Sequence, residues 1–328
     1  MKEEIRVSIV TKSSDLPEIE CNDFFHSVDF FKILEATPKQ KPYMALGING
    51  EGTVVAHLLV SVSFHNLLLP PFGYSHCHIY GEGVYTSEVT DKEAVFALFV
   101  SAIKNMLAHK FCLFIEISEL SSKMFGYGKL RENGFFPIQW QKIHNSLHSK
   151  HPLERLPQKL RNRLLLAEQR GIKAEIAQPN SRSLQQAVRL LRQYFLFKPR
   201  RAVRNAKLFE QLAENRQCKI FVSKVKNRVI GVCVCVFSGG NAYMWHLASR
   251  RKSYMMLYPA SYTVWTALKY AYDNHYAHMY FLDAGLPFKR NRMREFILNF
   301  GGKQVSEYRW FRIQLPWIGR VIDWFYNE

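Results

Sequence analysis

The chain has 328 residues, is 48% hydrophobic and 14% aromatic, and carries a formal net charge of +18. This composition supplies a packed core and excludes an intrinsically disordered protein. No apolar run is long enough for a membrane-spanning helix, and the opening residues, MKEEIRVSIVTKSSD, lack the apolar segment of a signal peptide. We therefore expect a cytoplasmic protein.

The excess positive charge lies entirely in the second half of the sequence. Residues 1–150 hold 14 lysines and arginines against 16 aspartates and glutamates, a net of −2, whereas residues 151–328 hold 31 against 11, a net of +20. This asymmetry predicts two domains, 1–150 and 151–328, of which only the second meets a polyanion or an anionic surface. A basic surface without a specific partner is the alternative.

The first half has the pattern of a mixed α/β domain. Two strands within 44–50 and 52–64 are typical of a hairpin with glycines in its turn. A helix is expected over 91–110, because apolar residues recur at helical spacing behind Asp91 as a helix cap. A strand at 112–118, a short helix ending in KLRENG and a strand within 135–147 follow.

The second half repeats this order of elements. Residues 217–249 are typical of three strands joined by the turns KNR and SGGN. A helix over 261–275, a strand over 279–285, a helix over 290–302 and a strand over 305–313 complete the chain. This order predicts mixed sheets with helices on their faces, and segment 147–158, which contains two prolines, is the expected connection between the halves.

The segment KLRNRLLLAEQRG, residues 159–171, is typical of a basic helix that ends at Gly171. Lys159, Arg163 and Arg170 fall on one stripe of this helix, beside an apolar stripe. From residue 155 to 228 the chain holds 19 lysines and arginines against 4 acidic residues. Because arginine forks suit phosphate oxygens, we predict that the stripe binds the phosphates of tRNA or of a nucleotide-linked substrate. A merely solvated helix face is the alternative.

Beyond this helix, the segments AYMWHLAS (242–249), YFLDAG (280–285) and REFILNFGG (294–302) follow in an order that resembles the Fem-like branch of the GNAT acyltransferase superfamily. In the first half, GTVVAHLLV, LPPFGY and LRENGF look like the first GNAT-like domain of that family. The resemblance implies an α/β fold of two tandem GNAT-like acyl-CoA N-acyltransferase domains. It implies an enzyme that transfers an acyl or aminoacyl group to an amine, such as one on a cell-envelope precursor. No cofactor would be bound permanently; acyl-CoA or aminoacyl-tRNA would be the anionic co-substrate.

Two features depart from the family pattern. Only residues 181–216 lie between the strand IKAEI and the next strand, which leaves no room for the long helical arm of staphylococcal peptidoglycan-bridge enzymes. The position of the glycine-rich pyrophosphate loop of simple GNAT acetyltransferases is occupied by SRRKSYMMLYP, which is basic but contains no glycine.

The resemblance places the active cleft in the second domain, between AYMWHLAS and YFLDAG. Asp283 matches the aspartate at the family's strand end and can accept or orient a proton of the attacking amine; an aspartate that caps the following turn is the alternative. His246, on the neighbouring strand, is a second candidate base, against a histidine of the core.

The loop after AYMWHLAS supplies the predicted donor-binding residues, which are Arg250, Arg251, Lys252 and Tyr254. The three cations, with a helix N-terminus behind them, suit the pyrophosphate of coenzyme A or the end of a tRNA. Tyr254 would line an acyl channel or polarise a carbonyl. A solvent-exposed polar loop is the alternative.

His76 and His78 have the spacing of some metal ligands, but no further ligand can be assigned, so we predict no metal site. The aromatic segment 315–328 either packs on the second domain or touches lipid peripherally, without stable membrane insertion. Two rival functions remain: a non-catalytic tRNA-binding protein on the same fold, and a simple acetyl-CoA-dependent acetyltransferase. The sequence makes no prediction of the oligomeric state.

Overall fold

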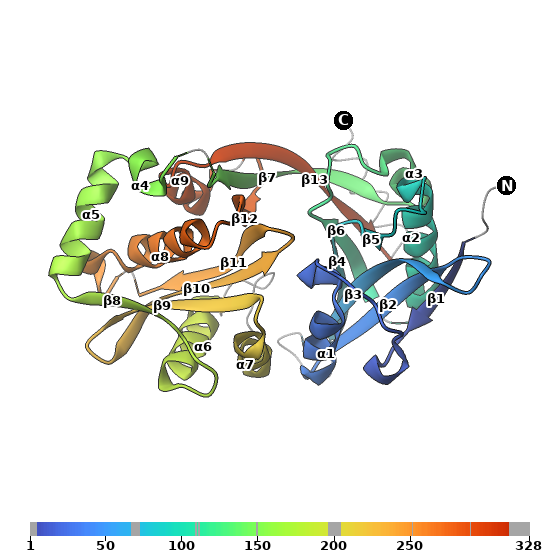
Figure 1. Cartoon of the computed structure of the whole chain (residues 1–328), viewed down its shortest axis with the longest axis horizontal. Helices are drawn as coiled ribbons and strands as arrows, with labels where there is room; N and C mark the ends of the chain where they lie inside the picture. Colours follow the sequence, from blue (N-terminus) through green and yellow to red (C-terminus); the bar gives the residue numbers. More distant parts are fainter. Residues whose placement is uncertain are drawn as a thin grey trace. The chain divides into compact units, whose positions relative to one another are not determined.

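The structure is a computed structural model that describes residues 5–66, 73–108, 110, 112–148, 150–195, 205–250, 252–288 and 290–314 (Figure 1). Of Asn66 and Asp283 it describes the backbone alone. The chain forms two compact units: unit 1 comprises Met1–Trp140 and Ser306–Glu328, and unit 2 comprises Gln141–Val305. Both units are mixed α/β, as predicted.

Unit 1 has a mixed sheet with the strand order β1-β2-β3-β4-β6-β13, and β5 pairs with β3. Its strands are β1 (Arg6–Val10), β2 (Gln40–Ile48), β3 (Val54–Asn66), β4 (Gly73–Tyr80), β5 (Val84–Tyr85) and β6 (Cys112–Ser118). Its helices are α1 (Val28–Ala36), α2 (Lys92–Ala108) and α3 (Tyr127–Glu132).

The predicted helix behind Asp91 is α2, which provides much of the core of unit 1. The Asp91 carboxylate accepts a hydrogen bond from the backbone N–H of Ala94 at 2.9 Å, and such a cap satisfies an N–H that has no partner inside the helix. The buried face of α2 contacts the sheet through Val95, Phe96, Phe99, Val100, Ile103 and Leu107.

Unit 2 has the strand order β7-β12-β11-β10-β9-β8. Its strands are β7 (Phe136–Ser146), β8 (Ile172–Ile176), β9 (Cys218–Val225), β10 (Arg228–Ser238), β11 (Asn241–Ser249) and β12 (His278–Gly285). Its helices are α4 (Pro152–Arg155), α5 (Gln158–Gln169), α6 (Arg182–Phe195), α7 (Ala206–Glu214), α8 (Pro259–Asp273) and α9 (Arg292–Leu298).

The three strands predicted over 217–249 are β9, β10 and β11. Their turns need a left-handed backbone, which Gly239 (φ 54°) and Gly240 (φ 75°) adopt without cost, and Lys226 (φ 53°) adopts in the first turn. The predicted basic helix is α5. Its C-terminal Gly171 has φ 80° and donates its N–H to the carbonyl of Glu168, as expected for a helix-ending glycine.

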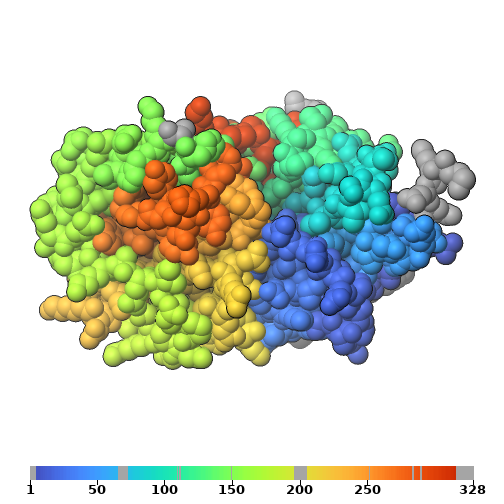
Figure 2. Space-filling view, viewed as in Figure 1, coloured from blue at the N-terminus to red at the C-terminus, as the bar shows by residue number. Residues whose placement is uncertain are grey.

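Helices α6 and α7 were not predicted from the sequence. α6 is amphipathic and packs on β10 and β11 through a buried stripe formed by Leu184, Ala187, Val188, Leu191 and Phe195. Figure 1 shows α6 and α7 on one face of the unit 2 sheet and α8 on the other. α8 lies beside α5, and these two helices form one continuous surface (Figure 2).

Two strands cross the boundary between the units, so the division departs from the predicted boundary after residue 150. β7 begins in unit 1, and its residues 143–146 pair with β12 of unit 2. β13 (Lys303–Ile313) begins in unit 2, and its residues 310–313 pair with β6 of unit 1. Each part of these two strands therefore belongs to the unit that contains the strand with which it pairs.

In the part of the chain that the structure describes, no helix has both the length and the apolar character that a membrane span requires. The aromatic segment 315–328 lies outside the described residues.

Candidate active site

β11 and β12 are parallel neighbours in the middle of the unit 2 sheet. Their pairing covers residues 241–244 against 278–281 and stops at Met244 and Phe281. Both strands nevertheless continue, to Ser249 and Gly285. The two strands therefore part beyond Met244 and Phe281, and backbone groups that face the gap no longer pair across it.

Each strand is irregular just past this point. The register of β11 against β10 shifts at Trp245, which is an extra residue and forms a β-bulge. The register of β12 against β7 shifts between Phe281 and Gly285, where three residues of β12 stand opposite one of β7. Bulges bend a strand and are common beside active sites. Both strands are therefore irregular at the point where the gap between them opens.

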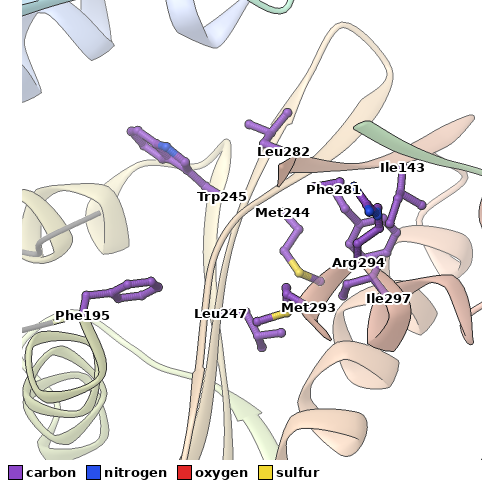
Figure 3. A pocket seen from close by; sticks show the side chains of 11 residues that line it. Ile143, Phe195, Met244, Trp245, Leu247, Phe281, Leu282, Met293, Arg294 and Ile297 are labelled. Atoms are coloured by element: carbon purple, nitrogen blue, oxygen red, sulfur yellow. The ribbon is translucent and has the colours of Figure 1, made fainter. Parts of the chain in front are cut away.

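A cavity of about 40 Å³ lies where the strands part. In Figure 3, Met244 points from β11 toward Met293, whereas Phe195 reaches in from the other side of β11. Arg294 is the only charged residue among the described residues that line the cavity. The lining residues are Ile143, Phe195, Met244, Trp245, Leu247, Phe281, Leu282, Ala284, Met293, Arg294 and Ile297.

Arg294 is held by the loop that follows β12. Its guanidinium donates hydrogen bonds to the carbonyls of Leu286 at 2.7 Å and Pro287 at 3.4 Å. Asn291 caps α9 by accepting from the N–H of Met293, and it donates to the carbonyl of Ala284 at 2.9 Å. These bonds fix the cavity wall that α9 provides.

The equivalent strands of unit 1 do not part. β4 and β6 are also parallel, and their pairing runs from Ser75 with Cys112 to Tyr80 with Ser118, the ends of both strands. Within the described residues, only unit 2 thus has the opening expected of an active cleft. That the second domain carries the active cleft stays a prediction.

The two candidate bases lie on the two parting strands. The backbone of Asp283 lies in the irregular stretch of β12, two residues beyond the last pair with β11, and its side chain is outside the described part of the structure. The His246 ring packs against Phe195 and Phe209, with centroids 5.8 and 5.6 Å away. The catalytic roles of Asp283 and His246 stay predictions.

The predicted phosphate stripe of α5 contacts the loop between β11 and α8. Arg163 stacks over the ring of Tyr258 at 5.3 Å, and Arg170 donates a hydrogen bond to the carbonyl of Met256. Lys159 is exposed at the beginning of α5. The structure therefore brings two of the three stripe residues to the predicted donor loop, where they hold the loop in place.

The donor loop itself offers few backbone donors for a pyrophosphate. It contains no glycine, and α8 begins with Pro259, which has no N–H. The residue before it, Tyr258, has φ 46°, a conformation that costs free energy for a side chain of this size. Arg250 is half-buried and Lys252 is exposed, whereas Arg251 lies outside the described residues. The ring of Tyr254 lies 5.8 Å from the Arg228 guanidinium.

His76 and His78 of unit 1 belong to a charged cluster around Glu116. The Glu116 carboxylate lies 3.2 Å from His76 Nε2 and 3.1 Å from Arg309 Nη1, and His78 Nε2 lies 2.9 Å from Ser118 Oγ. Burial alone would raise the pKa of Glu116, but His78, His76 and Arg309 together hold that pKa well below its usual range. In the described parts of the chain, no three His, Cys, Asp or Glu side chains are arranged to bind a metal ion.

The cavity-lining residues were not predicted from the sequence. Met244, Met293 and Phe195 are apolar residues in apolar segments, and nothing in their spacing distinguishes a cavity wall from an ordinary core. Of the elements that carry them, β11 and α9 were predicted, whereas α6, which carries Phe195, was not.

Comparison with known proteins identifies the same region. Residues 157–290 match the family model described as an acetyltransferase (GNAT) domain. No curated protein sequence matches the chain. Among the solved structures that share its fold are three whose identities, 11–13%, establish the fold alone.

The first of these structures is FemX, with 13% identity over 92% of this chain and 94% of that one, and a TM-score of 0.61. The second is a tandem GNAT protein from the clavulanic acid biosynthesis pathway, with 12% identity over 94% and 99% and a TM-score of 0.58. The third is L-PGS from Bacillus licheniformis, with 11% identity over 91% and 92% and a TM-score of 0.56.

The parted parallel strands lie within residues 157–290, the part of the chain that matches the GNAT acetyltransferase domain, and the class of protein that they indicate is an acyltransferase. The fold of two tandem units is shared with FemX and with the tandem GNAT protein.

Proposed function

We propose that this enzyme transfers a short, uncharged acyl group from a coenzyme A thioester to an amine, in the cleft between β11 and β12. The observation that carries the proposal is the apolar cavity where these strands part. One water-sized sphere needs roughly 10–15 Å³. The cavity of about 40 Å³ therefore suits an acyl chain of about three heavy atoms without rearrangement.

The charge of the cavity favours an acyl group over an aminoacyl group. An aminoacyl donor would bring an α-ammonium into the cavity, and burying a cation without a partner is costly. The one charged side chain in the described lining is the cation Arg294, which repels an ammonium group; the Asp283 carboxylate, which the reaction below uses as the base, would have to pair with the ammonium instead. A neutral alkanoyl chain avoids both penalties.

The reaction follows from positioning. The amine attacks the thioester carbonyl carbon and a C–N bond forms. The C–S bond then breaks, and coenzyme A leaves as its thiolate. Backbone N–H groups of β11 beyond Met244 that face the gap are available to stabilise the oxyanion. Asp283, near the end of β12, would take the proton of the amine.

A second candidate is aminoacyl transfer from tRNA, which the strongly basic segment 155–228 favours. Its net charge of +15 suits an RNA backbone. This candidate requires the cavity, or a rearranged form of it, to accept an ammonium group.

The test compares donors on the purified full chain. With acetyl-, butanoyl- and octanoyl-coenzyme A as donors and a panel of primary amines as acceptors, the release of free thiol is measured. With aminoacyl-tRNA as donor and the same amines, the cleavage of the ester bond between the amino acid and the tRNA is measured. We expect turnover with the short acyl thioesters and none with aminoacyl-tRNA. Turnover with aminoacyl-tRNA alone would contradict the proposal and support the second candidate.

Replacing a side chain that lines the cavity by a smaller one gives an independent check of where the acyl chain lies. Met244→Ala should raise the preference for octanoyl over acetyl donors roughly tenfold, because each added methylene that is buried contributes about 0.8 kcal/mol. Met279→Ala is the matched control, since Met279 is a fully buried methionine that does not line the cavity. An equal change in both variants would argue against an acyl chain beside Met244.

A further inference from the structure

A second hollow of unit 2, separate from the acyl cavity, follows the outer side of α6. This arginine groove has a volume of about 710 Å³. Figure 1 shows α6 on the face of the sheet opposite α8, the helix that follows the predicted donor loop. Residues of α6, of the turn between β9 and β10 and of the end of β11 line it: Arg182, Gln185, Gln186, Arg189, Gln193, Asn227, Arg228, Val229 and Arg250.

The charge of the arginine groove is uncompensated. Four of its lining residues are arginines, and none of the described lining residues is acidic. Glu175, on the neighbouring strand β8, is engaged elsewhere: its carboxylate accepts from Ser183 at 2.5 Å and pairs with Lys224 at 2.6 Å. Four guanidinium groups around one hollow repel one another, so an anion bound among them would be stabilised by all four.

Arg250 has a fixed backbone and a buried donor that could bind such an anion. It is half-buried, and its backbone N–H donates to the carbonyl of Ile230 at 2.8 Å, which fixes where the side chain begins. Nη2 reaches Gln193 at 3.3 Å, but the buried Nε–H has no hydrogen-bond partner among the described residues. A buried guanidinium donor without a partner is unusual and indicates a ligand atom.

The walls of the groove are fixed before any ligand binds. Gln186 ties α6 to the β9–β10 turn: it donates to the carbonyl of Asn227 at 3.1 Å and accepts from the N–H of Val229 at 2.8 Å. Arg182 and Arg189 are seven residues apart, two turns along the same face of α6. The helix therefore fixes the backbone of these two arginines, whereas their exposed side chains must still be ordered by the ligand.

Size and composition indicate the class of ligand. Pockets for small ligands span about 300–1,000 Å³, a range that includes the groove. Its described lining contains no aromatic ring on which a nucleic-acid base could stack, which disfavours single-stranded RNA. Amide side chains beside the arginines suit ribose hydroxyl groups and phosphate oxygens.

The groove and the acyl cavity share α6. Gln193 lines the first and Phe195, two residues on, lines the second. Arg189 is six residues before Phe195, or about 9 Å along the helix axis at 1.5 Å per residue. One phosphorylated molecule with a flexible arm can therefore occupy both.

We propose that the arginine groove binds a small ligand with two or more phosphate groups, through arginine side chains rather than the backbone of a glycine-rich loop. This inference concerns binding and does not depend on which acyl group is transferred.

The test measures binding of inorganic tripolyphosphate and adenosine 3′,5′-bisphosphate to the full chain by calorimetry at two salt concentrations. We expect the double variant Arg189→Gln/Arg228→Gln to weaken both by tenfold or more, because hydrogen bonds between charged groups are the strong ones. Arg192→Gln is the matched control: it lies on α6, is exposed, and does not line the groove. It should change affinity less than twofold.

The source of the phosphates is distinguished by competition with free coenzyme A. Displacement of tripolyphosphate by coenzyme A assigns the groove to the donor, whereas simultaneous binding assigns it to a separate phosphorylated substrate. The proposal is overturned if the double variant binds both probes like wild type, if Arg192→Gln is equally harmful, or if the groove variants weaken only RNA. Circular dichroism of each variant excludes loss of the fold as the cause.

Discussion

Asp283 lies at the position in β12 where regular pairing has ended on both sides, next to the gap between the strands. A carboxylate there can remove the proton that the amine carries after attack. We predict that Asp283→Asn lowers kcat by about 10²–10⁴-fold, with a much smaller change in KM, because the substrate still binds.

The control for Asp283 is an exposed aspartate of the same unit. Asp273 pairs with Lys269 on the surface of α8, and such exposed pairs contribute little, so Asp273→Asn should leave kcat within twofold. If Asp283→Asn retained wild-type kcat across the pH range, Asp283 would instead be a turn-capping residue.

At the level of single residues, polar chemistry was easier to predict than cavity shape. The loop cations and the α5 arginines were identified because charged residues that cluster in a sequence are visible without a structure. Arg163 and Arg170 nevertheless contact the donor loop directly, a tertiary role that one-dimensional spacing does not contain. The role of Met244 and Phe195 in lining the cavity could not be predicted, because a cavity wall and an ordinary core contain the same apolar residue types.

Among the elements, the beginning of β10 depends on a glycine for the close approach of α8. A side chain at Gly231 would collide with Ser223 Oγ, Thr263 Oγ1 and the carbonyl of Pro259. These groups are hydrogen-bonded to one another, with 2.6 Å between the two hydroxyl oxygens and 2.7 Å from Thr263 to Pro259.

We predict that Gly231→Ala destabilises the protein by about 1–3 kcal/mol, the usual cost of overpacking, as measured by urea unfolding. The same substitution at Gly128, where the added methyl group would meet nothing within 4 Å, should be neutral or slightly stabilising. Equal stability of the two variants would mean that the start of α8 can shift without cost.

Strands and turns with strong local signals were predicted, whereas α6 and α7 were not. The Gly239–Gly240 turn and the alternating residues of IKAEI are local features. The apolar residues of α6 recur at helical spacing, so this helix was predictable from the sequence, whereas its packing on β10 and β11 was not. The arginine groove was therefore predictable as a basic segment but not as a hollow.

On the scale of the whole molecule, the order of elements predicted two α/β units, but their composition depends on strand exchange. β7 and β13 each cross from one unit to the other. A boundary drawn along the sequence cannot show this, because pairing of β13 with β6 links residues almost 200 positions apart. Such non-local pairing is set by tertiary contacts.

The stability of the whole chain should depend on pH through two buried histidines of unit 1. Burial, together with the neighbouring His26, lowers the pKa of His57 to about 4. Burial also lowers the pKa of His26, whose Nδ1 accepts a hydrogen bond from the N–H of Leu59 at 3.1 Å. Both rings are therefore neutral in the folded protein at pH 7.

The sign of the effect follows from proton binding. The unfolded chain takes up these protons near pH 6.5, the ordinary histidine pKa, whereas the folded chain does not. The free energy of unfolding should thus be constant between about pH 7 and 8 and fall between about pH 6.5 and 4, by about 3 kcal/mol from His57 alone. The net charge of +18 adds a general acid destabilisation from repulsion among the cations.

Replacing His57 separates the two contributions. His57→Gln should reduce the fall in unfolding free energy between pH 6.5 and 4, whatever its stability at pH 7, because one of the two buried proton-binding sites is gone. His275→Gln removes an exposed histidine and should keep the wild-type slope. Urea unfolding at half-unit pH intervals measures both. If the wild-type and His57→Gln curves fell in parallel, charge repulsion across the molecule, and not the buried ring, would set its acid sensitivity.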